Sequence, residues 1–308
     1  MPRASGFRSF ALFIGLPLVP YAVFCLYPAA AGLFASLTRW DGYSQSWTFV
    51  GFENFRKLLL SDEVFRTALK NNLFIVVVPG LIVLALGLFL ANALNDRRMP
   101  LRRFFQFTYL FPNILAAVVV ASLWSFVYNP SFGIVKTLCL KLDGLLGVLG
   151  LAGASDAAGL KGLAAQAWLE PQHFMTALVP MIVWGGVGFY VILFLAGMQS
   201  IPRTLYEAAR LDGANEWQVF RHVTWPGLGP IVASAVTFTI IGGMKIFDAI
   251  WVLTQQNVPD RNQVLGTYVY QQAFVEANMG YGTAAAVVLL VITVGFVLIG
   301  HRLVRRHA

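Results

Sequence analysis

Six long apolar segments dominate this sequence of 308 residues, and they restrict its fold more than any other feature. Five of them contain no Asp, Glu, Lys or Arg, and the sixth contains only Lys245 and Asp248. A helix needs about 20 apolar residues to cross about 30 Å of hydrocarbon. The sequence therefore predicts an all-α integral membrane protein with six transmembrane helices, at about 10–37, 73–94, 104–128, 174–198, 226–253 and 281–300.

The composition agrees with a chain that resides in lipid. Hydrophobic residues make up 58% of the sequence and charged residues only 12%, with a mean hydropathy of +0.69. Ordinary soluble domains contain roughly 45–50% apolar and about 25% charged residues. A soluble domain cannot bury this much apolar surface, which excludes a soluble enzyme. The two cysteines, Cys25 and Cys139, are too few for a disulfide scaffold.

The first apolar segment has some features of a secretory leader, because arginines precede it and Ala29–Ala31 offers small residues for cleavage. The apolar core of a leader has about 7–15 residues. The segment here has 28 residues without a charge. We therefore expect it to remain in the protein as a transmembrane helix.

Basic residues are distributed unevenly between the two sides of six such helices. The side that holds both termini and the loops 95–103 and 199–225 has twelve of the 22 Lys and Arg but four of the 14 Asp and Glu. This surplus equals the net charge of +8 of the whole chain. Since Lys and Arg are enriched in cytoplasmic loops, we expect both termini and these loops to be cytoplasmic. The basic surplus needs no nucleic acid to explain it.

The two long outer loops, 38–72 and 129–173, are expected to contain surface helices. In the first loop, the interleaved aromatic residues of segment 49–55 are typical of a membrane interface. In the second loop, the stretch 144–167 is rich in Gly, Ala and Leu. We expect this stretch to be a flexible insertion.

The cytoplasmic loop 199–225 has the local pattern of two short helices. Pro202 suits a first helical position and Gly213 suits the left-handed residue after the last turn, which predicts a helix at 202–213. Asn215 and Gln218 have the spacing of a capping box at the start of a second helix. The fifth transmembrane segment then opens at Pro226.

One face of the first of these helices admits two interpretations. Leu205, Ala208, Ala209 and Asp212 recur at i, i+3, i+4 and i+7 and therefore lie on one face. Small side chains there would let another protein approach closely, and the charge of Glu207 would meet a basic partner, as in a docking helix. An ordinary amphipathic helix at the lipid surface would have the same pattern, and the residues alone leave both interpretations open.

The same loop resembles a known family motif. Glu207-Ala208-Ala209 is followed by Gly213 and then by Val223, Trp225 and Pro226. This spacing resembles the Glu-Ala-Ala…Gly…Ile-x-Leu-Pro signature of the membrane subunits of binding-protein-dependent ABC importers, with Trp225 in place of the usual Leu. Other segments resemble the maltose-type sugar and glycerol-phosphate permeases, namely 49–55, Phe111-Pro112, 247–254 and 270–274.

The resemblance implies a type I ABC importer permease fold, with residues 1–308 as one transmembrane domain in a bacterial-type inner membrane. It implies that loop 199–225 couples the chain to a cytoplasmic ATPase through Glu207, Ala208, Ala209, Asp212, Gly213 and Pro226. The implied partners are a homologous second permease subunit, two ATPase subunits, an external solute-binding protein and a sugar-like solute. The sequence contains no Gly-Lys-Ser/Thr phosphate loop, so ATP with Mg is expected on the ATPase, and no cofactor, metal or catalytic residue is expected here.

Polar and aromatic residues within the spans are candidates for a substrate pathway, because costly polar groups at membrane depth face a cavity or one another. Each of them could equally well pack between helices. Lys245 and Asp248 lie three residues apart and are expected to neutralise each other on one helix face. Gly185, Gly186 and Gly188 predict close helix packing. The pathway candidates are Asn113, Trp184, Tyr190, Phe247, Asp248 and Trp251.

An ion-gradient-driven secondary transporter is the alternative function. Such a carrier needs coupling carboxylates within its spans, and only Asp248 is available. Dependence of import on an ATPase would separate the two functions. A potassium channel is excluded because Gly280-Tyr281-Gly282 lacks the preceding Thr-Val of a selectivity filter. A membrane enzyme is disfavoured because the four histidines are scattered over loops and termini.

Overall fold

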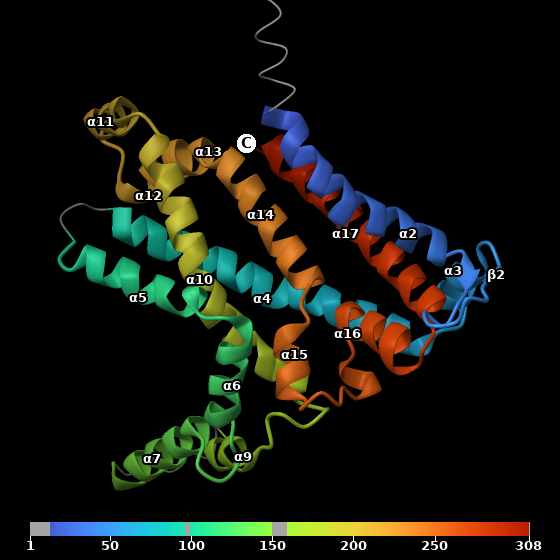
Figure 1. Ribbon diagram of the computed structural model, residues 1–308. Coiled ribbons are helices and arrows are strands. Elements are labelled where there is room, and N and C mark those ends of the chain that lie inside the picture. The colour runs from blue at the N-terminus through green and yellow to red at the C-terminus, as the bar shows by residue number, and fades with distance from the viewer. Residues whose placement is uncertain (1–12, 96–98, 150–158, 308) are drawn as a thin grey trace, which may run out of the picture. The chain divides into compact units, whose positions relative to one another are not determined.

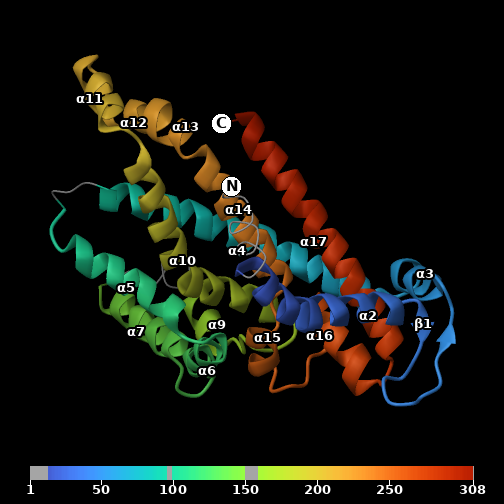
Figure 2. The same cartoon turned by 45° about the horizontal axis from the view of Figure 1, so that its top comes forward.

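The computed structural model describes residues 13–95, 99–149 and 159–307. They fall into two units, each held together mainly by contacts within itself. The first unit contains the residues up to 65 together with 268–291, and the second contains 66–267 and the residues from 292 onward. The described residues are almost entirely helical (Figures 1 and 2), which confirms the predicted all-α class.

Five helices are long and apolar enough to cross a membrane, and a bent pair of helices makes a sixth candidate. The first of the five covers Phe13–Ala35 and includes the π-helical turn η1 (Ala22–Leu26) and α2 (Tyr27–Ala35). The others are α4 (Glu63–Asn95), α10 (Phe174–Ser200), the segment Gly229–Leu253 and α17 (Met279–His307).

The third predicted span is not one straight helix. It consists of α5 (Arg102–Ile114) and α6 (Ala117–Val127), which meet at an angle of 99°. Leu115 and Ala116 have ψ angles of 142°, in the extended region, so the helical hydrogen-bond pattern stops there. The prediction of a continuous helix over 104–128 was therefore wrong at this point. Pro112 weakens the last turn of α5 because it has no backbone N–H group.

The fifth span is interrupted as well. It consists of α14 (Gly229–Met244) and α15 (Asp248–Leu253). Phe247, with φ −144° and ψ −61°, is not helical, and it separates the two parts. The span also starts later than predicted: Pro226 lies in the short helix α13 (Trp225–Gly227), and α14 begins at Gly229.

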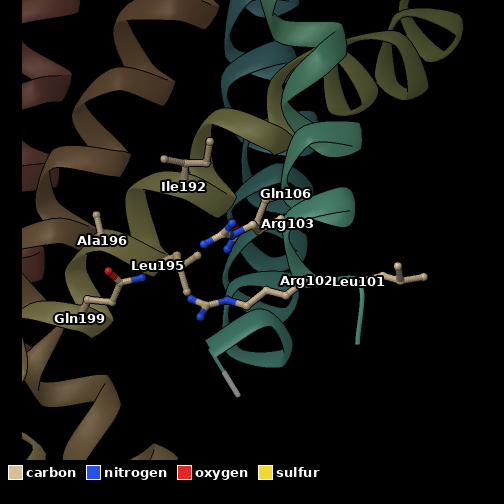
Figure 3. Close-up of a pocket in the computed structure, with 8 residues that line it drawn as sticks. All are labelled: Leu101, Arg102, Arg103, Gln106, Ile192, Leu195, Ala196 and Gln199. Atoms are coloured by element: carbon tan, nitrogen blue, oxygen red, sulfur yellow. The ribbon is translucent and has the colours of Figure 1, made fainter. Parts of the chain in front are cut away.

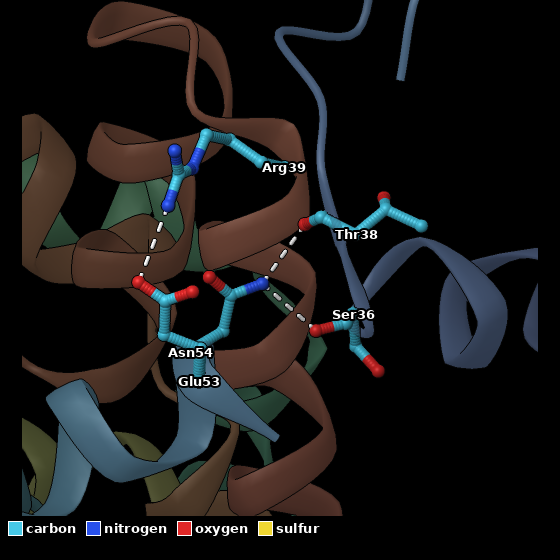
Figure 4. Close-up of polar contacts among 5 residues, drawn as sticks. All are labelled: Ser36, Thr38, Arg39, Glu53 and Asn54. Carbon is cyan, nitrogen blue, oxygen red and sulfur yellow. Dashed lines mark hydrogen bonds and ion pairs between the residues drawn. The ribbon is translucent and has the colours of Figure 1, made fainter. Parts of the chain in front are cut away.

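In the first unit, the end of the first span is tied to the outer loop. Strand β1 (Thr38–Arg39) pairs antiparallel with β2 (Thr48–Phe49), with Thr38 opposite Phe49, and α3 (Glu53–Leu60) follows. Asn54 Nδ2 donates hydrogen bonds of 2.9 Å to the carbonyl oxygens of Ser36 and Thr38 (Figure 4). Arg39 pairs with Glu53 at 3.2 Å. Segment 49–55 therefore supplies the groups that satisfy the backbone where the first span ends.

Helix α7 (Ile134–Val148) packs against α9 (Leu160–Ala165) in the second outer loop. Surface helices were predicted in both outer loops, and the structure confirms them. The stretch 144–167 differs from the predicted flexible insertion, because α7 extends to Val148 and α9 covers residues 160–165. Residues 150–158 of that stretch lie outside the described part of the chain.

The core of the second unit forms around α10. Gly188 lies so close to α5 that a Cβ atom at this position would overlap the carbonyl group of Tyr109. This contact confirms the predicted close packing at Gly188, whereas at Gly185 and Gly186 a Cβ atom would meet its nearest neighbours at ordinary contact distances of 4.0 and 3.5 Å. The remaining described elements are η2 (Phe220–Thr224), η3 (Asp260–Asn262), α16 (Leu265–Tyr270) and η4 (Gln271–Val275), together with α11 and α12, whose bounds follow below.

Candidate coupling loop and substrate pathway

Helix α11 (Arg203–Leu211) is the short helix predicted between the fourth and fifth spans. Pro202 is its N-terminal cap residue, one position before the helix rather than its first residue. The helix ends at Leu211 with Asp212 as its C-cap, and Gly213 has φ +81°, which a residue with a side chain rarely adopts. In both views of the molecule α11 lies beyond the end of α10 (Figures 1 and 2). The sequence thus predicted the helix to within two residues at each end.

Helix α11 packs against the core of its unit through the partly buried side chain of Tyr206. None of its residues is buried, and Leu211 is 88% exposed. Leu205, which is 51% exposed, adds a second apolar side chain to the surface of the helix. The predicted coupling residues are placed as follows: Glu207, Ala208, Asp212, Gly213 and Pro226 are exposed, and Ala209 is partly buried. A free, partly apolar surface of this kind suits docking to another molecule.

The next helix, α12 (Glu216–Val219), is capped as predicted. Asn215 Oδ1 accepts a hydrogen bond of 2.9 Å from the backbone N–H of Gln218. Gln218 Oε1 accepts one of 2.8 Å from the backbone N–H of Asn215. This reciprocal pair fixes the direction in which the chain leaves the turn at Gly213.

Two further contacts, neither of them predicted from the sequence, hold α11 against α12 and η2, the segments that lead to the fifth span. Tyr206 Oη and Thr224 Oγ1 share a hydrogen bond of 3.3 Å, in which either hydroxyl can donate. Arg210 pairs with Glu216 at 3.3 Å in exposed surroundings. Tyr206 and Thr224 lie 18 positions apart, so no local pattern pointed to the contact. The helix is thus exposed but fixed in position.

A groove of ≈ 1000 Å³ separates α11 from the ends of α4 and α10. Glu207 and Tyr206 line it on one side, and Asn92 and Asn95 line it on the other. Positively charged, negatively charged and uncharged polar side chains therefore line the groove beside α11. This surface can accept polar groups of a second protein around the apolar side chains of the helix.

Three of the predicted pathway aromatics, together with Trp124, form two ring contacts. Trp184 on α10 makes an edge contact with Trp124 on α6, with ring centroids 6.1 Å apart. Phe247 and Trp251 stack at 5.5 Å, directly at the interruption of the fifth span. Trp124 was not among the predicted residues, and nothing in its local sequence distinguishes it from an ordinary interfacial tryptophan.

Asn113 and Tyr190 make contacts between helices. Asn113 Nδ2 donates to the carbonyl oxygen of Gly185 at 3.3 Å while its side chain stays exposed. Tyr190 is buried, and Thr239 Oγ1 donates to its hydroxyl at 2.8 Å. The structure therefore places Tyr190 in the packing between α10 and α14, apart from the exposed candidates.

Lys245 and Asp248 do not form the predicted pair on one helix face. Helix α14 ends before Lys245 and α15 starts at Asp248, so the two side chains do not lie one helical turn apart. Both are exposed, and no ion pair joins them among the described residues. The prediction failed because it assumed a continuous helix through this point.

Asn72 holds the interrupted backbone in place. Its side chain is fully buried, and its Nδ2 donates to the carbonyl oxygens of Gly243 at 2.8 Å and Met244 at 3.3 Å. Its Oδ1 accepts a hydrogen bond of 2.6 Å from the backbone N–H of Leu265. Asn72 thus supplies hydrogen bonds to the last carbonyl oxygens of α14, which have no partner within the helix. The analysis missed it because its partners are distant in the sequence.

The segments that follow the two interruptions pack together. Helix α6 contacts α15 along its length, and Leu115 and Ile246 border the same hydrophobic cluster. Irregular backbone at membrane depth is tolerated only where it is buried in protein or lines a cavity. Transporters commonly place their substrate site at such broken helices. The interruptions and their aromatic residues are therefore the best candidate for a translocation pathway in the described residues.

Comparison with known proteins identifies the family. The model of the family described as "Binding-protein-dependent transport system inner membrane component" matches residues 64–308. The chain belongs to this family. A probable ABC transporter permease protein of Pyrococcus horikoshii is 32% identical over 97% of this chain and 96% of its own length. The diacetylchitobiose uptake system permease protein of Streptomyces coelicolor is 31% identical over 93% of this chain and 79% of its own length.

A solved structure has the same fold. It is the crystal structure of a bacterial alginate ABC transporter in complex with an alginate pentasaccharide-bound periplasmic protein. The matched chain is 25% identical, with a TM-score of 0.74, and the match covers 97% of this chain and 95% of that one. The resemblance to ABC importer permeases inferred from the Glu207-Ala208-Ala209 motif is thereby confirmed.

Membership of this permease family settles several functional alternatives. The chain is a multi-pass transmembrane component of an ABC importer, and ATP hydrolysis belongs to a separate subunit. No match supports the gradient-driven carrier considered from Asp248. The matched region contains α11 and both interrupted spans, so the family-level function and the candidate sites lie in the same part of the permease.

Proposed function

We propose that this permease carries a sugar or sugar-like solute across a bacterial-type inner membrane by alternating access. Two relatives support a carbohydrate: one is named for diacetylchitobiose uptake and the other transports alginate. The aromatic pairs Trp124–Trp184 and Phe247–Trp251 suit such a solute, because sugar rings stack on aromatic faces. Asp248 and Asn113, both exposed nearby on the broken spans, offer hydrogen-bonding groups for hydroxyls.

The working assembly in this proposal contains three kinds of partner protein. The permease pairs with a homologous second permease, and two cytoplasmic ATPase subunits bind ATP with Mg. An external solute-binding protein delivers the solute to the outer loops. Both termini and loop 199–225 face the cytoplasm, as the excess of twelve basic over four acidic residues on that side favours.

The observation that carries the coupling assignment is that α11 is largely exposed, with no fully buried residue, and yet fixed in position. The Tyr206–Thr224 hydrogen bond and the turn at Gly213 hold it. A mobile loop could not transmit movement, and a buried helix could not contact a partner. A fixed, exposed helix does both, which favours α11 as the element that docks on the ATPase.

Movement of α11 would reach the pathway through two helices. The chain enters α11 directly from α10 through the buried residue Ile201. It leaves through α12 and α13 into α14, where Leu228 is also buried. Helix α10 carries Trp184 and α14 leads to Phe247. In the proposal, closure of the ATPase dimer therefore shifts both sides of the aromatic cluster at once.

Copurification with the ATPase tests this function. The tagged chain is purified in mild detergent from a membrane that contains the candidate ATPase, together with Glu207→Lys and Gly213→Asp variants. We expect wild type to retain the ATPase and both variants to lose it, since one reverses an exposed charge and the other forces a side chain into a left-handed position. Glu170→Lys, a charge reversal at an exposed outer-loop position, is the matched control.

The assignment fails if both variants retain the ATPase and import at the wild-type rate. If wild type retains no ATPase, the docking role of α11 is wrong even though the family remains established. Uptake of labelled oligosaccharide by the assembled complex, with and without an inactivated ATPase, then tests the solute class independently.

A further inference from the structure

A second pocket lies between α5 and α10, close to loop 199–225. It has a volume of ≈ 700 Å³ and opens between the first turns of α5 and the last turns of α10. Figure 3 shows the side chains of Arg102 and Arg103 extending from α5 towards Leu195 and Gln199 on α10. Its lining residues are Leu101, Arg102, Arg103, Gln106, Ile192, Leu195, Ala196 and Gln199.

The pocket has two positive charges and no carboxylate among its lining residues. Neither Arg102 nor Arg103 forms an ion pair with any described residue. The Nε atom of Arg102 is buried and has no hydrogen-bond partner. Leaving a charged donor buried without a partner is costly. The pocket therefore offers a positive charge and an unused hydrogen-bond donor to an anion.

The position of the two arginines on α5 adds to the uncompensated positive charge of the pocket. They occupy the first turn of the helix, where the backbone dipole is positive and cations are unfavourable. The first turn contains no acidic residue, and no side chain caps it. A phosphate group there would meet both guanidinium groups and the unpaired backbone N–H groups together.

An apolar face starts directly beside the arginines. Phe104, Phe107 and Phe111 follow one another at i, i+3 and i+7 on α5, and they are 61%, 63% and 51% exposed. An apolar face of this kind on a candidate membrane span is compatible with lipid chains. A free phosphate ion would make no favourable contact with this apolar face. A phospholipid would place its headgroup at the arginines and its acyl chains along the phenylalanines.

We propose that this pocket binds the headgroup of an anionic phospholipid. Basic pockets between transmembrane helices on the cytoplasmic side are suited to such headgroups. The leaflet follows from the proposed orientation, because Arg102 also lines the groove beside α11. A bound lipid would brace α5 against α10 at the end where α10 continues into the coupling loop.

Native mass spectrometry of the full chain in mild detergent, with added phosphatidylglycerol or phosphatidylcholine, tests the proposal. We expect wild type to retain phosphatidylglycerol in preference to phosphatidylcholine. Arg102→Gln/Arg103→Gln should weaken phosphatidylglycerol binding roughly thirtyfold, since it removes two basic groups near the membrane surface. Arg103→Gln alone, at an exposed position, should weaken it about fivefold without disturbing the fold.

The matched control is Arg221→Gln/Arg302→Gln, which removes two charges from exposed positions on the same side of the membrane. It should leave the affinity unchanged. Equal binding by wild type and the Arg102/Arg103 variant would overturn the proposal. Displacement of the lipid by inorganic phosphate at equal concentration would assign the pocket to the free ion instead.

A third result would also overturn it. In a chain without Cys25 and Cys139, a Phe107→Cys variant that cross-links to the second permease would show that protein covers this face. None of these results affects the ATPase assignment, which is tested at Glu207 and Gly213.

Discussion

Asp62 Oδ2 accepts a hydrogen bond of 2.6 Å from the hydroxyl of Tyr268, a residue more than 200 positions later in the chain. The same oxygen accepts a hydrogen bond of 2.8 Å from Tyr281, and Oδ1 accepts one of 2.8 Å from the backbone N–H of Phe65. Asp62 therefore caps α4 and anchors the later part of the first unit to it. Burial works against its ionisation, but these hydrogen bonds outweigh burial and lower the pKa of Asp62.

The first prediction concerns pH. Because the folded state lowers the pKa of Asp62, its carboxylate stabilises the fold above the ordinary pKa of about 3.9, and this contribution is lost as pH falls through the lower folded value. We expect Asp62→Asn to lower the thermal unfolding midpoint at pH 7 and to flatten its decline below about pH 4. Thermal unfolding in detergent from pH 7 to 3 measures both. An unchanged profile would show that Asp62 contributes nothing through its charge.

The second prediction concerns Asn72. Asn72→Ala removes two donor contacts and one acceptor contact, which leaves buried backbone groups of Met244 and Leu265 without partners. We expect a destabilisation of about 2–3 kcal/mol. Asn72→Asp should be worse, because it turns a carboxylate oxygen towards two carbonyl oxygens. Unfolding midpoints and oligosaccharide uptake are the measurements, and wild-type values for both variants would refute the role of Asn72 in holding the interruption.

The third prediction compares two glycines on α10. A Cβ atom at Gly188 would overlap the backbone of Tyr109, whereas one at Gly185 would lie 4.0 Å from the nearest atom, Val120 Cγ1. Gly188→Ala should therefore force α5 away from α10 and cost about 1–3 kcal/mol. Gly185→Ala should be nearly neutral. The thermal unfolding midpoints of the two variants, purified in the same way, test this difference. Equal midpoints would mean that α5 moves away from α10 without loss of stability.

The fourth prediction concerns the aromatic pair at the interrupted span. Trp251→Ala removes the ring that stacks on Phe247. If the pair contacts the solute, uptake at low solute concentration should fall about tenfold, as expected for a lost stacking contact. Trp251→Phe should restore most of the activity because it keeps an aromatic face. As a control, both variants should copurify with the ATPase as well as wild type does. If the alanine variant takes up solute at the wild-type rate, Trp251 is not part of the pathway.

The sequence by itself determined the features that depend on neighbours along the chain. The apolar segments predicted the helical membrane fold because a span must be long and apolar whatever surrounds it. The reciprocal cap of Asn215 and Gln218 and the left-handed turn at Gly213 were predicted correctly for the same reason, since each depends on residues within one turn.

The tertiary structure alone decided where the third and fifth spans break. A helix can end within a membrane only if other groups satisfy its open backbone positions. For the fifth span those groups come from Asn72, whose partners Gly243 and Leu265 lie 171 and 193 positions away. No local pattern encodes such a contact, so Lys245 and Asp248 were expected on one continuous helix. Helix α11 was predictable because its signals are local. The breaks that form the candidate pathway were not, because long-range packing creates them.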